Sequence, residues 1–198
     1  MITRTIREQV TAKIRDQLVS GEFDGGQVLR ETEMATRFGV SRGPIRDAFL
    51  QLSQEGFLAY QANCGVTVRQ PPNPEHRSFI VSLRRQIEEF GVREGLESLS
   101  EDSLRSVEEA LESLKTACGG DQVAEVARAD MAFHEAILIG CSGDEFAGAW
   151  RQLCARMQMS YTRLEDYAAV YSEHTKIFKA VRARDVEATV AAITENLR

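Results

Sequence analysis

The chain has 198 residues, of which 43% are hydrophobic, and a formal net charge of -6. This length allows one domain or two small ones, each able to bury a core of its own. No run of eighteen apolar residues occurs, the N-terminus is polar and the four cysteines form no CxxC pair; we therefore expect a cytoplasmic protein with reduced thiols and no membrane partner.

The stretch from Leu29 to Val68 predicts two short helices joined by a glycine turn, a helix-turn-helix. Gly39 ends the first helix because only glycine readily adopts a left-handed conformation there. We expect Ser41 to cap the second helix by accepting a hydrogen bond from a first-turn amide. The second helix repeats apolar residues at intervals of three and four, at Ile45, Ala48, Phe49 and Leu52.

Two arginines, Arg42 and Arg46, lie one turn apart at the exposed start of this second helix. An arginine near the start of a recognition helix can donate two hydrogen bonds to a guanine edge in the major groove. The first-turn amides also favour a nearby phosphate. The pattern therefore predicts binding to double-stranded DNA, although two solvated arginines on an ordinary helix would show the same spacing.

Two short β-prone runs follow, Phe57–Tyr60 and Val66–Val68, separated by a loop that contains Asn63 and Gly65. This pattern predicts a β-hairpin, the wing of a winged helix-turn-helix. We expect Gly65 to allow the wing backbone to approach DNA closely.

Taken together, these residues closely resemble the GntR family of bacterial transcription regulators. The resemblance is dense over the first 70 residues and is carried by Met34-Ala35, Phe38-Gly39-Val40-Ser41-Arg42, Pro44-Ile45-Arg46, Glu55-Gly56 and Gly65. It implies a regulator that binds a two-fold symmetric operator as a homodimer.

The segment 71–74 contains three of the four prolines of the chain and predicts a stiff linker between two domains, 1–70 and 75–198. The first domain holds nine Lys and Arg residues against eight Asp and Glu, and the remainder of the chain holds fifteen against twenty-two. The acidity therefore belongs to the second domain, which we expect to face away from DNA.

Beyond the linker the apolar periodicity predicts an all-α bundle of six helices, so the fold class is mainly α with one small hairpin. The expected helices cover about 75–98, 102–118, 121–140, 143–164, 170–183 and 185–198. On the first of them we expect a buried side formed by Phe79, Leu83, Ile87, Phe90 and Leu96.

Three possible metal ligands occur in the second domain. Asp130 and His134 are four residues apart, so they share one face of a helix, and His174 follows on a later helix. Facing helices of a bundle can bring such residues together around an ion. Residues of these types also form ordinary hydrogen bonds or lie on the surface, so the pattern leaves both interpretations open.

The second domain also resembles the ligand-binding (FCD) domain of the FadR-type branch of the same family, in its short, VanR-like form. The resemblance rests on Asp130-x3-His134-Glu135, Phe146, Trp150 and Glu173-His174. It implies a divalent metal, zinc or nickel, that anchors a small carboxylate effector. Asp130, His134 and His174 match three of the four ligand positions, and Asn196 occupies the fourth, where an amide oxygen is a poorer ligand for these metals than imidazole.

Arg84 is the residue that we expect to recognise the effector. It shares a helix side with Ile80 and Ile87, and an inward arginine can bind a carboxylate through two hydrogen bonds. The alternative is a surface ion pair with Glu88, four residues later.

Two other functions fit parts of the sequence. One is a DNA-binding sensor in which the metal, or oxidation of Cys64 at the wing tip, is the signal. The other is a metal-dependent hydrolase, because an open position on a metal can activate water; it would leave the DNA-reading half unexplained.

Overall fold

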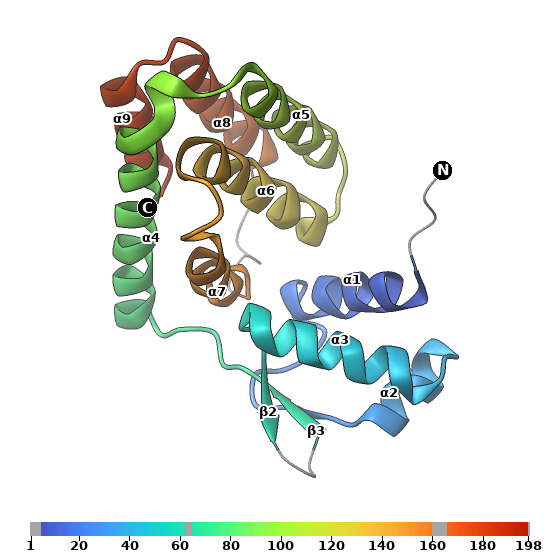
Figure 1. Cartoon of the computed structure of the whole chain (residues 1–198). Helices are drawn as coiled ribbons and strands as arrows, with labels where there is room; N and C mark the ends of the chain where they lie inside the picture. Colours follow the sequence, from blue (N-terminus) through green and yellow to red (C-terminus); the bar gives the residue numbers. More distant parts are fainter. Residues whose placement is uncertain (1–4, 62–64, 160–165, 198) are drawn as a thin grey trace. The chain divides into compact units, whose positions relative to one another are not determined.

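The computed structural model describes residues 5–61, 65–159 and 166–197. The chain forms two compact units, one made of residues 1–72 with 151–162 and the other of residues 73–150 with 163–198. Figure 1 shows the elements of both along the chain. Within the described residues, no helix is both long and apolar enough to cross a membrane.

The first unit is a winged helix-turn-helix, as predicted. Its elements are α1 (Ile6–Val19), β1 (Val28–Leu29), α2 (Glu31–Phe38), α3 (Arg42–Glu55), β2 (Leu58–Gln61) and β3 (Gly65–Val68). The strands form one antiparallel sheet in the order β1-β3-β2. The hairpin was expected, whereas β1 is too short to carry an alternating pattern and was not.

The turn between α2 and α3 follows the predicted geometry, with one exception. Gly39 ends α2 in the left-handed conformation, with φ of 64°, and the four predicted apolar residues of α3 are buried. Ser41 occupies the N-cap position, but its side chain makes no capping hydrogen bond. The expected cap is therefore wrong, because the exposed hydroxyl of Ser41 does not point back to the first-turn amides.

Gly65 is required by the sheet itself, whether or not the wing also approaches DNA at this residue. Its φ of 93° lies in the left-handed region, and a Cβ atom there would overlap the carbonyl oxygen of Leu29 in β1. The need for glycine therefore arises inside the sheet. The wing tip itself, residues 62–64 with Cys64, lies outside the described residues.

The described part of the second unit is helical throughout. Its chain order is α4 (Pro74–Gly95), the short 3-10 helix η1 (Leu96–Ser98), α5 (Glu101–Cys118), α6 (Val123–Ser142), the start of α7 (Ala147–Gln158), α8 (Tyr167–Arg182) and α9 (Val186–Asn196). From Arg151 onward, α7 belongs to the first unit. Side chains cap four of these helices, at Asn73, Ser100, Asp166 and Asp185. The six predicted α-helices are thus present, although α7 begins later than expected and residues 160–165 are not described.

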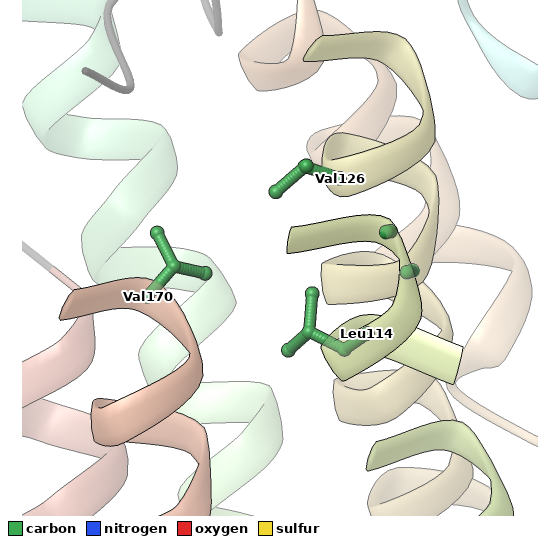
Figure 2. Packing of buried hydrophobic residues seen from close by; sticks show 5 residues of the cluster. Leu114, Val126 and Val170 are labelled. Atoms are coloured by element: carbon green, nitrogen blue, oxygen red, sulfur yellow. The ribbon is translucent and has the colours of Figure 1, made fainter. Parts of the chain in front are cut away.

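Helix α5 packs against both α6 and α8, and aliphatic side chains of the three helices form one buried cluster (Figure 2). Leu114 of α5 and Val126 of α6 are fully buried, and Val170 of α8 completes the cluster with Ala117 and Ala129. This packing holds α6 and α8 side by side and so places the residues of their inner faces close together.

The buried side of α4 differs from the prediction. Phe79 is 63% exposed and Phe90 51% exposed, whereas Arg84 and Glu88 are buried together with Ile80, Val81 and Val92. Leu96 is buried as expected, and Leu83 and Ile87 are half-buried. The prediction failed because the core-facing side of α4 carries two charged residues, so apolar periodicity pointed to a face about one residue further round the helix.

Gly95, the last residue of α4, lies where the backbones of α4 and α6 come close together. A Cβ atom at Gly95 would overlap the carbonyl oxygen of Cys141 in α6, a backbone atom that cannot rotate away. We expect Gly95→Ala to lower the free energy of unfolding by about 1–3 kcal/mol, measured by urea denaturation. The control is Gly43→Ala, where a Cβ meets nothing within 4 Å in helix α3; it is expected to leave stability unchanged or raise it by up to about 1 kcal/mol. Equal stability of the two variants would contradict this packing.

Candidate functional site

The start of α3 presents Arg42 and Arg46 on the surface, as predicted, with side chains 59% and 65% exposed. Both are held by one carboxylate that the sequence analysis gave no role, that of Glu31 at the start of α2. Nη2 of Arg42 lies 2.8 Å from Oε2 of Glu31, and Nε of Arg46 lies 2.9 Å from Oε1. Glu31 thereby keeps two like charges side by side.

The electrostatics of this cluster follow from the shared acid. Hydrogen bonds from Arg46 and then from Arg42 lower the pKa of Glu31 to about 2, and the same contact raises the pKa of Arg46. Glu31 is 20% exposed, so solvent weakens each ion pair. The two guanidinium groups remain accessible for a stronger anionic partner.

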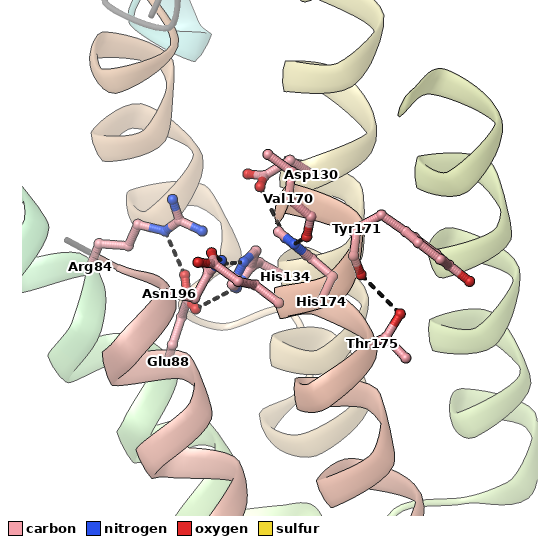
Figure 3. A network of polar contacts seen from close by, with 10 residues as sticks. Arg84, Glu88, Asp130, His134, Val170, Tyr171, His174, Thr175 and Asn196 are labelled. Atoms are coloured by element: carbon pink, nitrogen blue, oxygen red, sulfur yellow. Dashed lines mark hydrogen bonds and ion pairs between the residues drawn. The ribbon is translucent and has the colours of Figure 1, made fainter. Parts of the chain in front are cut away.

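In the second unit, Asp130, His134 and His174 come together, as expected of a metal site (Figure 3). Asp130 and His134 project from one face of α6, and His174 projects from α8. One ligand atom from each lies within 4.8 Å of the others, and all three residues are buried. The packing of both α6 and α8 against α5, with Val126 and Val170 in one cluster, explains this proximity.

The hydrogen bonds of the two histidines fix which ring nitrogen faces the cluster. Nδ1 of His174 lies 2.8 Å from the carbonyl oxygen of Val170, and Nδ1 of His134 lies 2.8 Å from Oε2 of Glu88. A carbonyl and an ionised carboxylate only accept, so Nδ1 is the donor in both rings. Nε2 of each ring is then the atom turned toward the centre, the usual arrangement of histidines that bind a metal.

Two oxygen atoms face these Nε2 atoms. Oδ1 of Asp130 is 2.9 Å from Nε2 of His174, and Oδ1 of Asn196 is 3.1 Å from Nε2 of His134. The amide nitrogen of Asn196 donates to Glu173 at 3.0 Å, which turns the amide oxygen inward. Four candidate ligand atoms, two nitrogens and two oxygens, therefore face one region of the bundle.

The charges of the cluster are strongly coupled. Burial opposes ionisation of Asp130, but His174, followed by His134 and Arg84, outweighs it and holds the pKa of Asp130 well below its ordinary value. Burial likewise lowers the pKa of His174, yet Asp130 more than compensates, so the net shift is upward. Asp130 is thus an anion in the interior, where it needs cationic partners.

Arg84 points inward, as expected, and it pairs with Glu88, but in the core and not on the surface. The side chains of both residues are 3% exposed, and Nε of Arg84 lies 2.6 Å from Oε1 of Glu88. The indole nitrogen of Trp150 donates to the same oxygen at 2.7 Å. The sequence expectations of an inward arginine and of an i,i+4 pair are therefore both met by one buried contact.

The cluster has the chemistry of a divalent-metal site. Nε2 of His174 is buried and, despite its closeness to Asp130, makes no aligned hydrogen bond to any described residue. An ion at this point would accept the lone pair of that nitrogen and could also bind Asp130 and the His134 imidazole directly. Residues of these types fit a divalent cation that keeps positions open for water or another oxygen ligand.

The sequence analysis had named Trp150 only as a residue that carries a family resemblance and Glu88 only as a possible surface partner of Arg84, and it gave Glu31 no role. The signal for the Arg84–Glu88 pair was their spacing of four residues, which predicts contact but not burial. The contacts of Glu31 with Arg42 and of Trp150 with Glu88 cross between elements, and no local pattern encodes them.

The fold combines a winged helix-turn-helix unit with a helical unit, the architecture of a DNA-binding regulator, and similar proteins identify its family. Residues 6–68 match the family described as bacterial regulatory proteins, gntR family, and residues 80–198 match the FCD domain. The chain therefore belongs to the GntR family of transcription regulators, in the group that carries an FCD domain.

Similar proteins span almost the whole chain. The HTH-type transcriptional repressor RspR of Escherichia coli is 25% identical over 99% of this chain and 87% of its own length. A probable D-xylose utilization operon repressor of Paenarthrobacter nicotinovorans is 24% identical over 98% and 88%. Among solved structures, E. coli McbR/YncC superposes with a TM-score of 0.77 at 22% identity, covering 98% of this chain and 94% of that one. These relatives are regulators and not enzymes, which removes the support for a hydrolase.

Proposed function

We propose that this chain is a repressor that binds a two-fold symmetric DNA operator as a homodimer. In this proposal a divalent metal and a small organic acid bind inside the helical unit and control DNA binding. The observation that carries the ligand-binding part is the convergence of Asp130 and the Nε2 atoms of His134 and His174 in the bundle interior. Repression is suggested by relatives that are named as repressors, including RspR.

DNA recognition is assigned to the start of α3 and to the wing. Arg42 and Arg46 are accessible and adjacent, and the exposed Ser41 precedes the first-turn amides of the helix. A guanine edge or a phosphate would replace Glu31 as the partner of each arginine. Gly65 brings the start of β3 close to β1 and so shapes the base of the wing.

The metal assignment rests on the donor set and on charge. Asp130, His134 and His174 supply one anionic oxygen and two neutral nitrogens, with the Asn196 oxygen beside them. If both histidines are neutral, the buried charges of Arg84, Glu88 and Asp130 sum to -1. A divalent ion makes the sum +1, which one carboxylate of an effector would neutralise. Zinc and nickel both bind imidazole and carboxylate groups, so we propose one of these two metals.

Arg84 is proposed to attract the acid by its positive charge. Its charge reaches both Asp130 and His174, since it lowers the pKa of Asp130 and opposes the upward shift of His174. Its Nε atom is already bound to Glu88.

A homodimer is favoured by the outer face of α4. Phe79, Leu83, Ile87 and Phe90 form a stripe along this helix, and Phe79 and Phe90 are more than half exposed. Two copies of one stripe can cover each other about a two-fold axis. A symmetric dimer would also present two recognition helices to two half-sites.

We expect Arg42→Ala and Arg46→Ala each to weaken operator binding by about 1–3 kcal/mol, because each removes contacts with a base edge.

Glu31→Gln should raise the affinity for unrelated DNA and reduce the discrimination between operator and unrelated DNA, since it removes a negative charge and frees both arginines. Fluorescence anisotropy on a duplex that the wild type selects from a randomised pool measures both effects. Arg105→Ala, an exposed arginine of α5, is the control. Unchanged affinity in both Arg42→Ala and Arg46→Ala would contradict the assignment.

Metal and acid are tested together by elemental analysis and thermal melting. The wild type should retain zinc, nickel or manganese after dialysis, His174→Ala should lose the metal, and Asn196→His should bind it more tightly. A di- or tricarboxylate should raise the melting temperature only with metal present, and less in Arg84→Ala. His76→Ala removes the third, exposed histidine and should behave as wild type.

The outcomes separate the candidate signals. A wild type that takes up none of the three metals rejects the metal site. Metal that changes operator affinity without any acid favours the metal-responsive sensor instead. Stabilisation by an acid that survives Arg84→Ala together with His174→Ala rejects the proposed effector position.

For the dimer, we expect Phe79→Ser combined with Phe90→Ser to shift the protein toward monomers in sedimentation velocity. The reason is the loss of two exposed apolar anchors from the stripe. Leu50→Ser, at an exposed leucine of α3 that is 55% accessible, should leave the oligomeric state unchanged. A double variant that sediments as the wild type does would exclude α4 as the interface.

A further inference from the structure

Glu88 is a carboxylate surrounded by donors from three helices. Its Oε1 atom accepts from Nε of Arg84 on α4 at 2.6 Å and from the indole nitrogen of Trp150 on α7 at 2.7 Å. Its Oε2 atom lies 2.8 Å from Nδ1 of His134 on α6. The guanidinium of Arg84 also faces the Trp150 ring, 5.5 Å from its centroid. Figure 3 shows Glu88 between Arg84 and His134.

These three donors constitute a built anion site. Arg84 supplies a positive charge, Trp150 an N–H and His134 a second N–H, and Arg84, His134 and Trp150 are at most 2% exposed. A carboxylate is well matched to this arrangement, since its two oxygens can accept from different directions. Without an anion at this point, the buried charge of Arg84 would lose the carboxylate that compensates it, which is costly.

We propose that Glu88 is a positioning residue for the metal site, and that the pocket around it binds a free small carboxylate once the Glu88 side chain is removed. The positioning part rests on the proposed metal site; the pocket does not. By accepting from Nδ1, Glu88 fixes the His134 ring so that Nε2 faces the region of Asp130, His174 and Asn196. Loss of such a carboxylate partner typically weakens metal binding about 10–100-fold.

The pocket also explains what can bind beside the metal. Because Glu88 already fills it, a free carboxylate is excluded from the Nε side of Arg84 in the native protein. An effector must therefore approach from the side of Asp130 and His174. Glu88 in this way selects for acids that bind through the metal.

The fluorescence of Trp150 can report whether this pocket is occupied. It is the only tryptophan of the chain and it donates directly to Glu88, so its fluorescence reports whether an anion occupies this point. This readout requires neither DNA nor metal.

The experiment compares Glu88→Ala, Glu88→Gln and the wild type, with formate and acetate as probes. Glu88→Ala empties the pocket, so formate should restore its melting temperature and its Trp150 emission toward those of the wild type. Glu88→Gln keeps the pocket filled and should not respond, nor should the wild type. Glu94→Gln, at an exposed glutamate of the same helix, controls for loss of charge on α4.

Zinc affinity, measured by competition with a chelator, supplies the second arm. Glu88→Ala and Glu88→Gln should bind zinc about 10–100-fold more weakly than the wild type, and formate should recover part of the loss in Glu88→Ala only. If Glu88→Ala does not fold even with formate, the free-carboxylate pocket is rejected, and the positioning role is decided by Glu88→Gln.

The two proposals fail in different ways. A wild type that binds no zinc, while formate still rescues Glu88→Ala, rejects the metal site but leaves the anion pocket standing. A wild type that binds zinc, with both Glu88 variants equal to it and no response to formate, rejects the role of Glu88 and leaves the metal site standing.

Discussion

The buried contact between Arg84 and Glu88 constrains the rest of the helical unit. Both side chains are 3% exposed, so each charge must be compensated by protein groups and not by water. The compensation comes from Trp150 and His134 on two other helices, which therefore cannot shift independently of α4. A buried ion pair of this kind adds little net stability compared with an apolar contact of the same size. Its contribution is to specify where α4, α6 and α7 must lie.

The same constraint orders the ligand atoms of the cluster. His134 receives its orientation from Glu88, and His174 receives its own from the carbonyl oxygen of Val170 one turn earlier on α8. Neither orientation depends on a bound ion, so the two Nε2 atoms face the cluster before anything binds. A preorganised donor set lowers the cost of ordering side chains on binding. The amide of Asn196 is held in a comparable way by Glu173.

The winged helix and the number of helices could be predicted because their signals are local. Gly39 ends α2 through a conformation that its neighbours cannot adopt easily, and the apolar spacing of α3 reports its buried face directly. The cluster of Asp130 and His134 was predictable from a spacing of four residues, whereas its contact with His174 required the family resemblance. The inner face of α4 was not predictable from hydropathy, because hydropathy assigns the apolar side of a helix to the core and α4 buries Arg84 and Glu88 there.

The burial of two charged residues on α4 also explains why apolar residues lie on its exposed side. When the inward positions are charged, the apolar residues Phe79 and Phe90 are left on the outside, about one residue round the helix, and they are more than half exposed. A single helix then carries the buried Arg84–Glu88 pair on one face and a partly exposed apolar stripe on another. The cost of exposing the stripe is removed if a second copy covers it, and the charged inner face is compensated within each copy. Any ligand that shifts the partners of Glu88 therefore acts on the helix that, in the proposed dimer, sets the relation between the two subunits. Such coupling needs only about 1–3 kcal/mol of preference for one arrangement to change DNA affinity measurably.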